Sequence, residues 1–490
     1  MNWNTPAPLD QTAFDPVEVF NAGLQNHAIA NTAYPIGHLT TMRPYRIPRS
    51  EVQSFAPLAW GGIQRLGLYV HIPFCEKRCG FCEYTVLDPA NNAENEDLYF
   101  DLLLREFDLY RQALGAQCKT LIGFDIGGGT PSAAKTEQIA RLVEAARQTF
   151  QLPETVTISI ETTPKIAASQ PEKMSAYYEM GIRRISMGVQ TINPRLLEEV
   201  GRTATSITYN QEAVENIRLA GFQRFNIDIM YGFANQSLKS LAATLQHVID
   251  LNPEYITLYR TRYKGTRLAA QAQWVTLEEV NAQAGLAKER LLAAGYFATP
   301  GKNTFSRLRG EPGTSDYLTE RVINGTPYLG LGLGAQSLSE VTLAYNSGAA
   351  DKRLEHYKRQ VEAGELPIQD LYYLSREAAM GKMISVSFYF GEVNLASFRR
   401  KFGLHLEEAF AAEAAFLLEN DLMAYSGGED AALRLTSLGE KNYNGVIALF
   451  YAGAVKAHLL EMAAAEAILV PVWDEIKEKN PLIFTNLHEV

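Results

Sequence analysis

The sequence has no apolar run that approaches the roughly 20 residues needed to cross a bilayer. Its first residues contain neither a basic nor an apolar segment, so we expect no signal peptide. Basic residues are also outnumbered, because 45 Lys and Arg face 55 Asp and Glu and give a net charge of −10. This balance argues against non-specific nucleic-acid binding. We therefore expect a cytoplasmic protein that binds neither membranes nor nucleic acid.

The overall composition is that of an ordinary globular chain. Hydrophobic residues make up 47% and charged residues 20% of the 490 positions. These values exclude a disordered chain, a collagen-like chain and a disulfide-dense miniprotein. The length leaves room for about two to four domains.

Cysteine is scarce, and its distribution is informative. Of the four cysteines, three lie close together at Cys75, Cys79 and Cys82. A loop this short cannot form a disulfide with good geometry and still provide a partner for the third thiol. The spacing instead allows three thiolates to surround one small inorganic centre.

Two kinds of centre are compatible with three cysteines. A structural zinc ion requires four protein ligands, so it would have to recruit His71 or the distant Cys118. An iron–sulfur cluster held by three cysteines leaves one iron open to another ligand. We favour the cluster, with zinc as the alternative, and expect Cys118 to be a buried structural thiol.

Apolar, β-rich segments alternate with helical patterns through the first part of the chain. Residues 236–251 have the apolar stripe of an amphipathic helix. We expect strands at residues 66–72, 120–126, 155–161, 183–189, 223–230 and 255–259. Such alternation requires right-handed parallel crossovers, hence an α/β barrel or an open α/β sheet. Six units are too few for a closed eight-stranded barrel, so we predict an α/β fold with a partial (β/α)6 barrel and ligands at its carboxyl-terminal strand ends.

Polar or glycine-rich motifs stand at the ends of these expected strands. Gly127-Gly-Gly-Thr-Pro131 follows the second, and its glycines allow the backbone to approach a ligand closely. Glu161, Gln190 and Asp228 stand at or near the ends of the next three. A single polar residue in such a position is often a satisfied core group. Several of them beside a cysteine loop indicate a binding site.

These motifs together resemble a known family. Cys75-x3-Cys79-x2-Cys82, with Phe81 before the last cysteine, is similar to the radical S-adenosylmethionine (SAM) signature. The segment from Tyr69 to Cys82, the glycine motif, the strand-end blocks and Tyr328-Leu-Gly-Leu-Gly-Leu-Gly-Ala-Gln-Ser resemble the oxygen-independent coproporphyrinogen III oxidase-like family. The resemblance covers about residues 60–450.

The resemblance implies a role for each matching residue. Cys75, Cys79 and Cys82 would hold a [4Fe–4S] cluster, and Tyr69, Gly128 and Glu161 would surround the SAM bound to it. This family binds a second SAM beside the first. The positions that match the site of the second SAM are Phe81, Gly129, Thr130, Gln190, Arg202 and Asp228. Without the resemblance, Arg202 reads as a surface arginine after a helix.

The resemblance also implies a domain organisation. The expected segments are a 1–60 N-terminal extension, a 61–300 radical SAM partial barrel, a 301–370 barrel-completing and substrate-covering segment, a 371–451 small helical, winged-helix-like domain, and a 452–490 helical C-terminal extension.

One departure from the family keeps three functions open. The oxidases of haem synthesis have a fourth cysteine where this chain has Tyr84. Of the three, oxidative decarboxylation of a tetrapyrrole is the favoured function, because the overall architecture of the sequence resembles that family. A two-SAM radical methyltransferase or cyclopropanase follows, favoured by Tyr84, and a haem-binding chaperone without oxidase activity is third.

In all the catalytic cases, a reduced cluster cleaves SAM to a 5′-deoxyadenosyl radical that abstracts hydrogen from the substrate. We expect a reductase or flavodoxin-type protein to donate the electron. A tetrapyrrole carries carboxylates, which need nearby cations. The basic residues expected to supply them are Arg260, Arg262, Lys264 and Arg267. A solvated basic loop is the alternative reading of this stretch.

Overall fold

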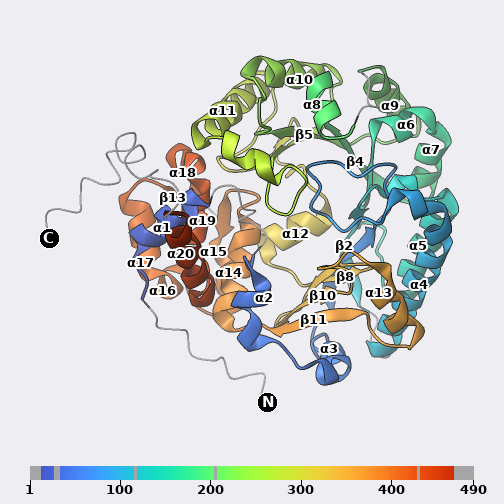
Figure 1. Ribbon diagram of the computed structural model, residues 1–490, viewed down its shortest axis with the longest axis horizontal. Helices are drawn as coiled ribbons and strands as arrows, with labels where there is room; N and C mark the ends of the chain where they lie inside the picture. Colours follow the sequence, from blue (N-terminus) through green and yellow to red (C-terminus); the bar gives the residue numbers. More distant parts are fainter. Residues whose placement is uncertain (1–12, 27–33, 115–118, 203–206, 428–430, 468–490) are drawn as a thin grey trace, which may run out of the picture.

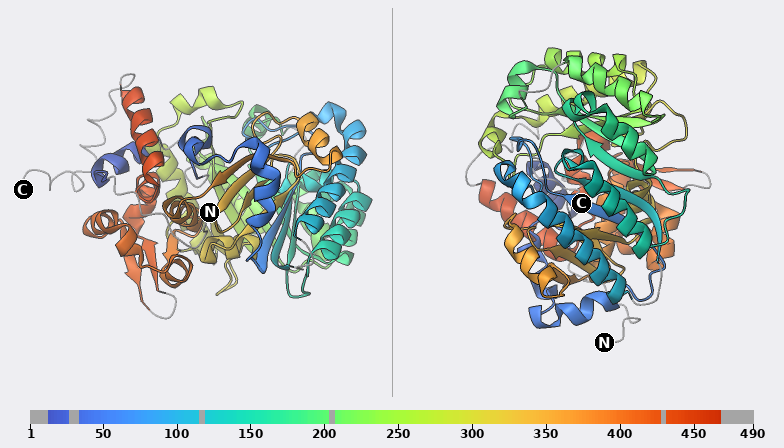
Figure 2. Two further views of the ribbon diagram at one scale, coloured as in Figure 1. Left: turned by 90° about the horizontal axis from the view of Figure 1, so that it is seen from below. Right: turned by 90° about the vertical axis from the view of Figure 1, so that its right-hand side faces the viewer.

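The computed structural model describes residues 13–26, 34–114, 119–202, 207–427 and 431–467. Two hydrophobic cores dominate it. The larger core lies between the central sheet and the helices around it, and the smaller one joins the C-terminal helices to the first helix of the chain. Figure 2 shows the barrel and the C-terminal part side by side. Among the described residues, none of the helices combines the length and apolar character that crossing a bilayer requires.

The six strands expected from the sequence are all present and pair in parallel in chain order. Their bounds are β1 (Arg65–Ile72), β2 (Thr120–Gly128), β3 (Ile158–Thr162), β4 (Ile182–Gln190), β5 (Phe225–Tyr231) and β6 (Tyr255–Arg260). Each observed strand overlaps its expected range. The third begins at Ile158 rather than at residue 155, because the residues before it form a turn.

Helices surround the outer face of these strands, as Figure 1 shows. They are α4 (Asn92–Ala113), α5 (Thr136–Thr149), α6 (Pro164–Ser169), α7 (Pro171–Glu179), α8 (Pro194–Glu199), α9 (Ile207–Leu219), α10 (Leu238–Asp250) and α11 (Leu277–Ala293). The expected helix at 236–251 is α10. It begins where the Ser237 side chain accepts a hydrogen bond from the Ser240 amide, and it buries Leu241, Leu245 and Val248.

The alternation of side chains along a strand separates the core from the barrel interior. On β5, Phe225, Ile227 and Ile229 are fully buried in the larger core. Asn226 and Asp228 lie on the opposite face because successive side chains of a strand point in opposite directions. Polar residues are therefore directed to the inside of the barrel, where a ligand can reach them.

The sheet extends beyond the expected six strands at both edges. The additional strands are β7 (Thr304–Ser306), β8 (Tyr328–Leu331), β9 (Gln336–Leu338), β10 (Thr342–Asn346) and β11 (Ile368–Tyr373). β8 pairs in parallel with β1, and β7 pairs antiparallel with β6. The Tyr328 motif of the sequence is therefore a strand beside the one that precedes the cysteine loop.

One helix of the segment 301–370 packs directly on the sheet. A Cβ added at Gly123 of β2 would lie 2.1 Å from the Tyr317 backbone nitrogen at the start of α12 (Asp316–Asn324). No side chain fits in that space, so glycine permits this close approach. The other helix of the segment, α13 (Leu354–Glu362), packs on α4.

The C-terminal part contains a small antiparallel sheet of order β12-β14-β13 surrounded by helices. Its elements are α14 (Arg376–Ser387), β12 (Glu392–Asn394), α15 (Leu395–Phe402), α16 (Leu406–Ala409), α17 (Ala411–Glu419), β13 (Met423–Ser426), β14 (Ala432–Leu435), α18 (Ser437–Lys441), α19 (Tyr443–Ala448) and α20 (Gly453–Ala467). Three short strands with helices are consistent with the expected winged-helix-like arrangement. The domain boundaries themselves remain a proposal.

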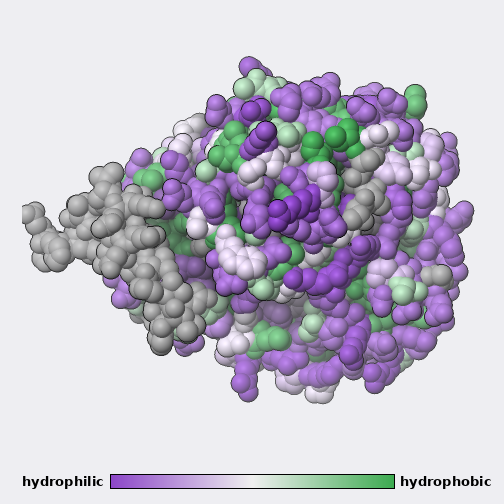
Figure 3. Space-filling model, turned by 45° about the horizontal axis from the view of Figure 1, so that its top comes forward, coloured by the Kyte–Doolittle hydropathy of each residue, from purple (hydrophilic) through white to green (hydrophobic). Residues whose placement is uncertain are grey.

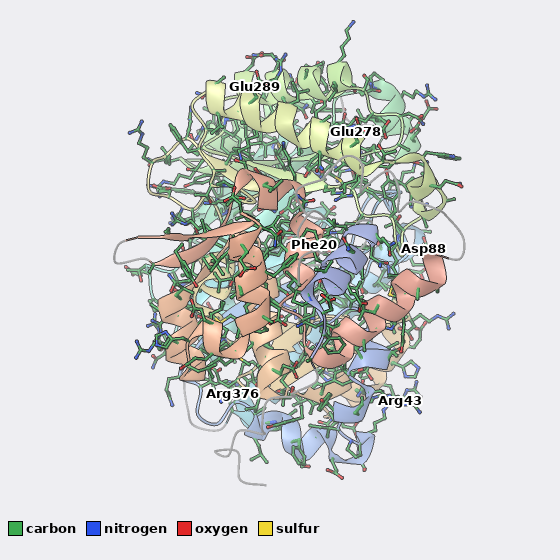
Figure 4. All side chains as sticks on the ribbon, turned by 90° about the vertical axis from the view of Figure 1, so that its left-hand side faces the viewer. Phe20, Arg43, Asp88, Glu278, Glu289 and Arg376 are labelled. Carbon is green, nitrogen blue, oxygen red and sulfur yellow. The ribbon has the colours of Figure 1, made fainter. Side chains whose placement is uncertain are left out.

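The first part of the chain packs against the last. The chain begins with α1 (Pro16–Gln25), α2 (His38–Thr41) and α3 (Val52–Leu58). Phe20 of α1 is fully buried, and its ring centroid is 5.5 Å from that of Phe416 on α17. Figure 4 shows Phe20 among the C-terminal helices. The N-terminal extension therefore contributes to the C-terminal core.

Candidate functional site

The three clustered cysteines lie on the loop after β1 and line one cavity of about 420 Å³. They are free thiols, and burial raises the pKa of Cys75 to about 12 and raises that of Cys82. A metal centre must therefore displace their protons on binding. Within the described ranges, no three His, Cys, Asp or Glu side chains are grouped as a site for a single metal ion. Cysteine thiolates are the ligands that hold iron–sulfur clusters, so this donor set fits a cluster.

The glycine motif after β2 supports the cysteine loop. The Gly129 amide donates to the carbonyl of Ile72 at 2.8 Å, and the Thr130 amide donates to that of Phe74 at 2.7 Å. The Thr130 hydroxyl also lies 3.5 Å from the sulfur of Cys75. These contacts fix the start of the cysteine loop against the neighbouring strand end.

The zinc alternative does not fit the position of His71. Its ring is buried, with Nε2 2.7 Å from the carbonyl oxygen of Thr85 and Nδ1 3.1 Å from the Tyr69 hydroxyl. Burial also lowers the pKa of His71 to about 4. Both ring nitrogens are thus engaged away from the cysteines. The other suggested fourth ligand, Cys118, lies outside the described residues.

Two carboxyl groups lie on the inner wall of the cavity. Glu161, at the end of β3, is exposed to the cavity, whereas Asp228 of β5 accepts hydrogen bonds from Ser186 Oγ at 3.1 Å and Asn226 Nδ2 at 2.6 Å. Burial of the site, reinforced by Asp228 and Asp125, raises the pKa of Glu161 to about 8. Burial also raises the pKa of Asp228 to about 6. The wall therefore favours a cationic ligand.

Gln190 has the geometry of a residue held for a ligand. Its backbone φ is +67°, an uncommon value for a residue other than glycine, and the β4–β5 register shifts between Gly188 and Gln190. Its side-chain oxygen is buried and finds no hydrogen-bond partner among the described residues. Such an arrangement is typical of functional sites, where the strain is offset by ligand binding.

Arg202, which follows α8, bridges β4 and the cysteine loop. Its Nη1 donates to the carbonyl of Gly188 at 2.6 Å, and its Nε lies 3.1 Å from the sulfur of Cys79. Its guanidinium carbon is 5.7 Å from the centroid of the Phe81 ring. The reading of Arg202 as a surface arginine is therefore wrong.

The cavity brings together nearly all residues singled out from the sequence. The lining includes Cys75, Cys79, Phe81, Cys82, Gly128, Gly129, Thr130, Glu161, Gln190, Arg202 and Asp228. Tyr69 is the exception, because its hydroxyl meets His71 and the residue is not part of the lining. Tyr84, which departs from the family pattern, also lines the cavity and is 58% exposed.

The sequence reasoning missed several lining residues. They are Glu76, Lys77, Glu83, Thr162, Thr163, Lys165, Ile166, Ser186, Gly188, Gly201, Met230, Tyr259 and Tyr389. Ser186 and Gly188 alternate with Met187 and Val189 on β4, so the strand period would have identified them. Tyr389 follows α14 and comes from a distant part of the chain, where no local pattern signals it.

The basic residues after β6 separate into two groups. Arg260 and Arg262 line the cavity, and Arg262 pairs with Glu83 at 2.9 Å. Arg267 instead donates to the backbone carbonyl of Arg78 beside an outer groove. Lys264 is exposed and is not part of the described cavity linings. Only the first pair is thus placed to meet a ligand in the barrel.

Comparison with known proteins gives the same picture. Residues 69–248 match the Radical SAM superfamily. The chain is 36% identical over 200 residues to the heme chaperone HemW of Buchnera aphidicola subsp. Schizaphis graminum, covering 40% of this chain and 50% of the relative. It is 27% identical over 365 residues to the oxygen-independent coproporphyrinogen III oxidase of Escherichia coli K12, covering 72% of this chain and 78% of that oxidase. The chain spans about half the length of the HemW relatives it matches.

A solved structure confirms the fold class. The coproporphyrinogen III oxidase HemN from Escherichia coli superposes with a TM-score of 0.70 at 24% identity, covering 86% of this chain and 96% of that one. The superfamily implies a [4Fe–4S] cluster and SAM, which the residues around the cavity fit.

Above about pH 8, where the wild-type carboxyl is ionised, replacing Glu161 by Gln should weaken SAM binding about ten- to a hundredfold, because a charge-assisted hydrogen bond to a cationic ligand is lost. With a pKa of about 8, the wild-type carboxyl is mostly protonated at pH 7, so its contribution grows as the pH rises from 6 to 8. Equilibrium dialysis should show that the dissociation constants of the two proteins for SAM differ more and more as the pH rises across this range.

The matched control for this prediction is Glu172→Gln, which changes an exposed acid on α7. It should bind SAM like the wild type at every pH. A Glu161→Gln protein with wild-type affinity throughout would assign Glu161 a structural role.

Proposed function

Because residues 69–248 form a radical SAM domain, we propose that this protein is an enzyme that binds a [4Fe–4S] cluster through Cys75, Cys79 and Cys82 and uses SAM for radical chemistry. One observation carries the proposal. The three thiols lie in the same cavity as polar groups from the ends of β2, β3, β4 and β5. Several strand ends that meet at one place are the usual position of chemistry in such barrels.

When bound, the cluster and SAM supply an electron and a 5′-deoxyadenosyl radical, which removes hydrogen from a carbon that acid–base groups cannot activate. The chain positions these components. Arg202 places a positive charge beside the sulfur of Cys79, which compensates part of the thiolate charge. Glu161 provides a carboxyl group whose ionised form pairs with the cationic ligand. The aromatic rings of Phe81, Tyr259 and Tyr389 limit the access of water.

We propose that the cavity also holds a second SAM molecule. The unpartnered oxygen of Gln190 can accept a hydrogen bond from a ligand, and Asp228 can accept one from a ribose hydroxyl. Arg202 can pair with a carboxylate. The residues proposed for this second site are Phe81, Gly129, Thr130, Gln190, Arg202 and Asp228.

The proposed substrate is a tetrapyrrole with propionate side chains. The similarity to coproporphyrinogen III oxidase extends over most of that enzyme, and Arg260 and Arg262 offer charges for carboxylates. In this reaction the bound cofactors would supply the removal of one hydrogen atom from a propionate, and loss of carbon dioxide and of one electron to an acceptor would leave a vinyl group. A reductase or flavodoxin-type protein would supply the electron that starts each turn.

Two other functions have specific support. Tyr84 exposes its side chain to the cavity at the position where the haem-synthesis oxidases carry a cysteine, which favours a methyltransferase or cyclopropanase that consumes the second SAM. The HemW relatives favour a haem-binding chaperone. In the second case the protein would bind haem and would not cleave SAM in response to a substrate.

The function is tested by incubating the reduced holoprotein anaerobically with SAM and coproporphyrinogen III. The oxidase reading predicts carbon dioxide, 5′-deoxyadenosine and a vinyl-bearing product that accumulate together, as measured by liquid chromatography. Haem binding with no product above a substrate-free control would contradict it.

A further inference from the structure

A second cavity of about 200 Å³ opens beside the first. We call it the side chamber. It is bounded by the ends of β6 and α11, by residues 301–303 and by α18 and α19 of the C-terminal part. Figure 4 shows α11, which carries Glu278 and Glu289, running above the C-terminal helices. The residues shared by the two cavities are Tyr259, Arg260, Arg262 and Tyr389. The two cavities therefore adjoin each other along these side chains.

The side chamber has a strong excess of positive charge. Its described cationic residues are Arg260, Arg262, Lys288, Lys302 and Lys441, and its described acidic residue is Glu440. Glu440 is already engaged by Lys288 at 2.5 Å and by the Gly301 amide at 3.0 Å. Arg262 pairs with Glu83 at 2.9 Å, whereas Lys302 and Lys441 have no carboxylate partner among the described lining residues of the chamber. Such a space attracts anions.

Lys302 is a partly buried cation of this chamber. Its ammonium lies 4.6 Å from the centroid of the Phe390 ring, and it has no hydrogen bond or ion pair with any described residue. Burial lowers the pKa of Lys302 to about 8, and Glu392 opposes that shift. A partly desolvated ammonium is costly unless an anion pairs with it.

The position of Lys302 is fixed by the backbone. Its amide donates to the carbonyl of Thr299 at 3.1 Å, and the residue forms an isolated bridge with Phe390. The backbone of Lys302 is therefore tied to both the barrel and the C-terminal part, and its ammonium lies over the Phe390 ring.

The rest of the chamber wall combines apolar side chains with the polar residues Thr261, Asn281, Asn303 and Asn444. It contains Leu258, Val280, Phe305 and Phe388, together with the rings of Tyr231 and Tyr443. Such a wall suits a ligand that combines a flat apolar body with carboxylates. Nucleotides and free inorganic anions lack that combination.

We infer that the side chamber binds carboxylate groups of the substrate that do not react, with Lys302 as a specificity-determining residue. This inference rests on the proposed function, because it assumes that the substrate enters the barrel. Beyond the proposed function, it states that the end of the substrate that does not react lies in the side chamber. The reacting carbon would then stay in the central cavity, on the far side of Tyr259 and Tyr389 from the held carboxylates.

The test uses coproporphyrin III, a stable tetracarboxylate, as the probe, and its tetramethyl ester as the uncharged counterpart. Fluorescence titration of the anaerobic holoprotein should give binding of the acid that is at least about tenfold tighter than that of the ester. Lys302→Gln should remove most of this difference, and Lys302→Arg should restore most of it. Lys239→Gln, an exposed lysine on α10 outside both cavities, should leave it unchanged.

Iron content measured on each variant verifies that it has folded. Equal affinity for acid and ester, or a Lys302→Gln protein that binds like the wild type, would overturn the inference. If either of these results were obtained while the wild type consumed coproporphyrinogen III, the proposed function would stand and only the inference about the side chamber would be wrong. Acid-selective binding that depends on Lys302, without such consumption, would support the chamber and contradict the oxidase reading.

Discussion

Replacing Cys75, Cys79 or Cys82 by Ala is expected to reduce the iron content from about four atoms per chain to near zero and to abolish SAM cleavage. Each of the three thiols lines the same cavity, so the loss of one leaves the cluster without one of its three protein ligands. Iron analysis and the visible absorption of anaerobically reconstituted protein measure the first effect. Formation of 5′-deoxyadenosine measures the second.

The fourth cysteine of the chain provides the matched control. Cys118→Ala should keep its iron and its SAM cleavage, because the proposed ligand set does not include it. Loss of the cluster in Cys118→Ala, with retention in Cys79→Ala, would contradict the ligand assignment.

Replacing Arg202 or Asp228 by Ala should suppress substrate turnover about a hundredfold or more while leaving the iron in place. Asp228 accepts two hydrogen bonds on the inner wall and contacts no cysteine in the described structure. Arg202 touches Cys79 but is not one of the three ligands. Turnover is measured by chromatography of 5′-deoxyadenosine and product, with iron analysis on the same samples.

Arg195→Ala is the control for this pair. Arg195 lies on α8 close to Arg202 in sequence, but its side chain is 78% exposed and forms an ion pair with Glu199. It should turn over substrate like the wild type. Normal turnover in both Arg202→Ala and Asp228→Ala would show that the second SAM site is not where we propose it.

The sequence predicted the barrel well because its strands are continuous apolar segments with regular helical patterns between them. β8 was not expected, since Tyr328–Leu331 is short and lies in a glycine-rich stretch that reads as a loop. Its pairing with β1 depends on a contact across more than 250 residues. Scattered surface residues also limit prediction from the sequence. Figure 3 shows hydrophobic residues scattered over a mostly hydrophilic face, and such positions carry no periodic signal of a helix or strand.

The sequence predicted the residues of the candidate site that belong to short local motifs. The cysteine spacing, the glycine motif and the polar strand ends all belong to short segments, and the fold brings them to one cavity. The kink at Gln190 and the contact of Arg202 with Cys79 depend on pairing between strands and loops, which no single segment specifies. Tyr389 lines both cavities because the C-terminal part packs beside β6, and Lys302 lines the side chamber from the segment before it.

The most direct test of the account follows the fate of SAM labelled on its methyl group. Reduced holoprotein is incubated anaerobically with this SAM and coproporphyrinogen III, and the products are separated by chromatography. The account predicts 5′-deoxyadenosine and carbon dioxide formed with substrate consumption, and label recovered in methionine but absent from the product. Substrate consumption accompanied by S-adenosylhomocysteine and label on product carbon would contradict the oxidase reading in favour of methyl transfer. Absence of 5′-deoxyadenosine from iron-replete, reduced protein would contradict the radical SAM account itself.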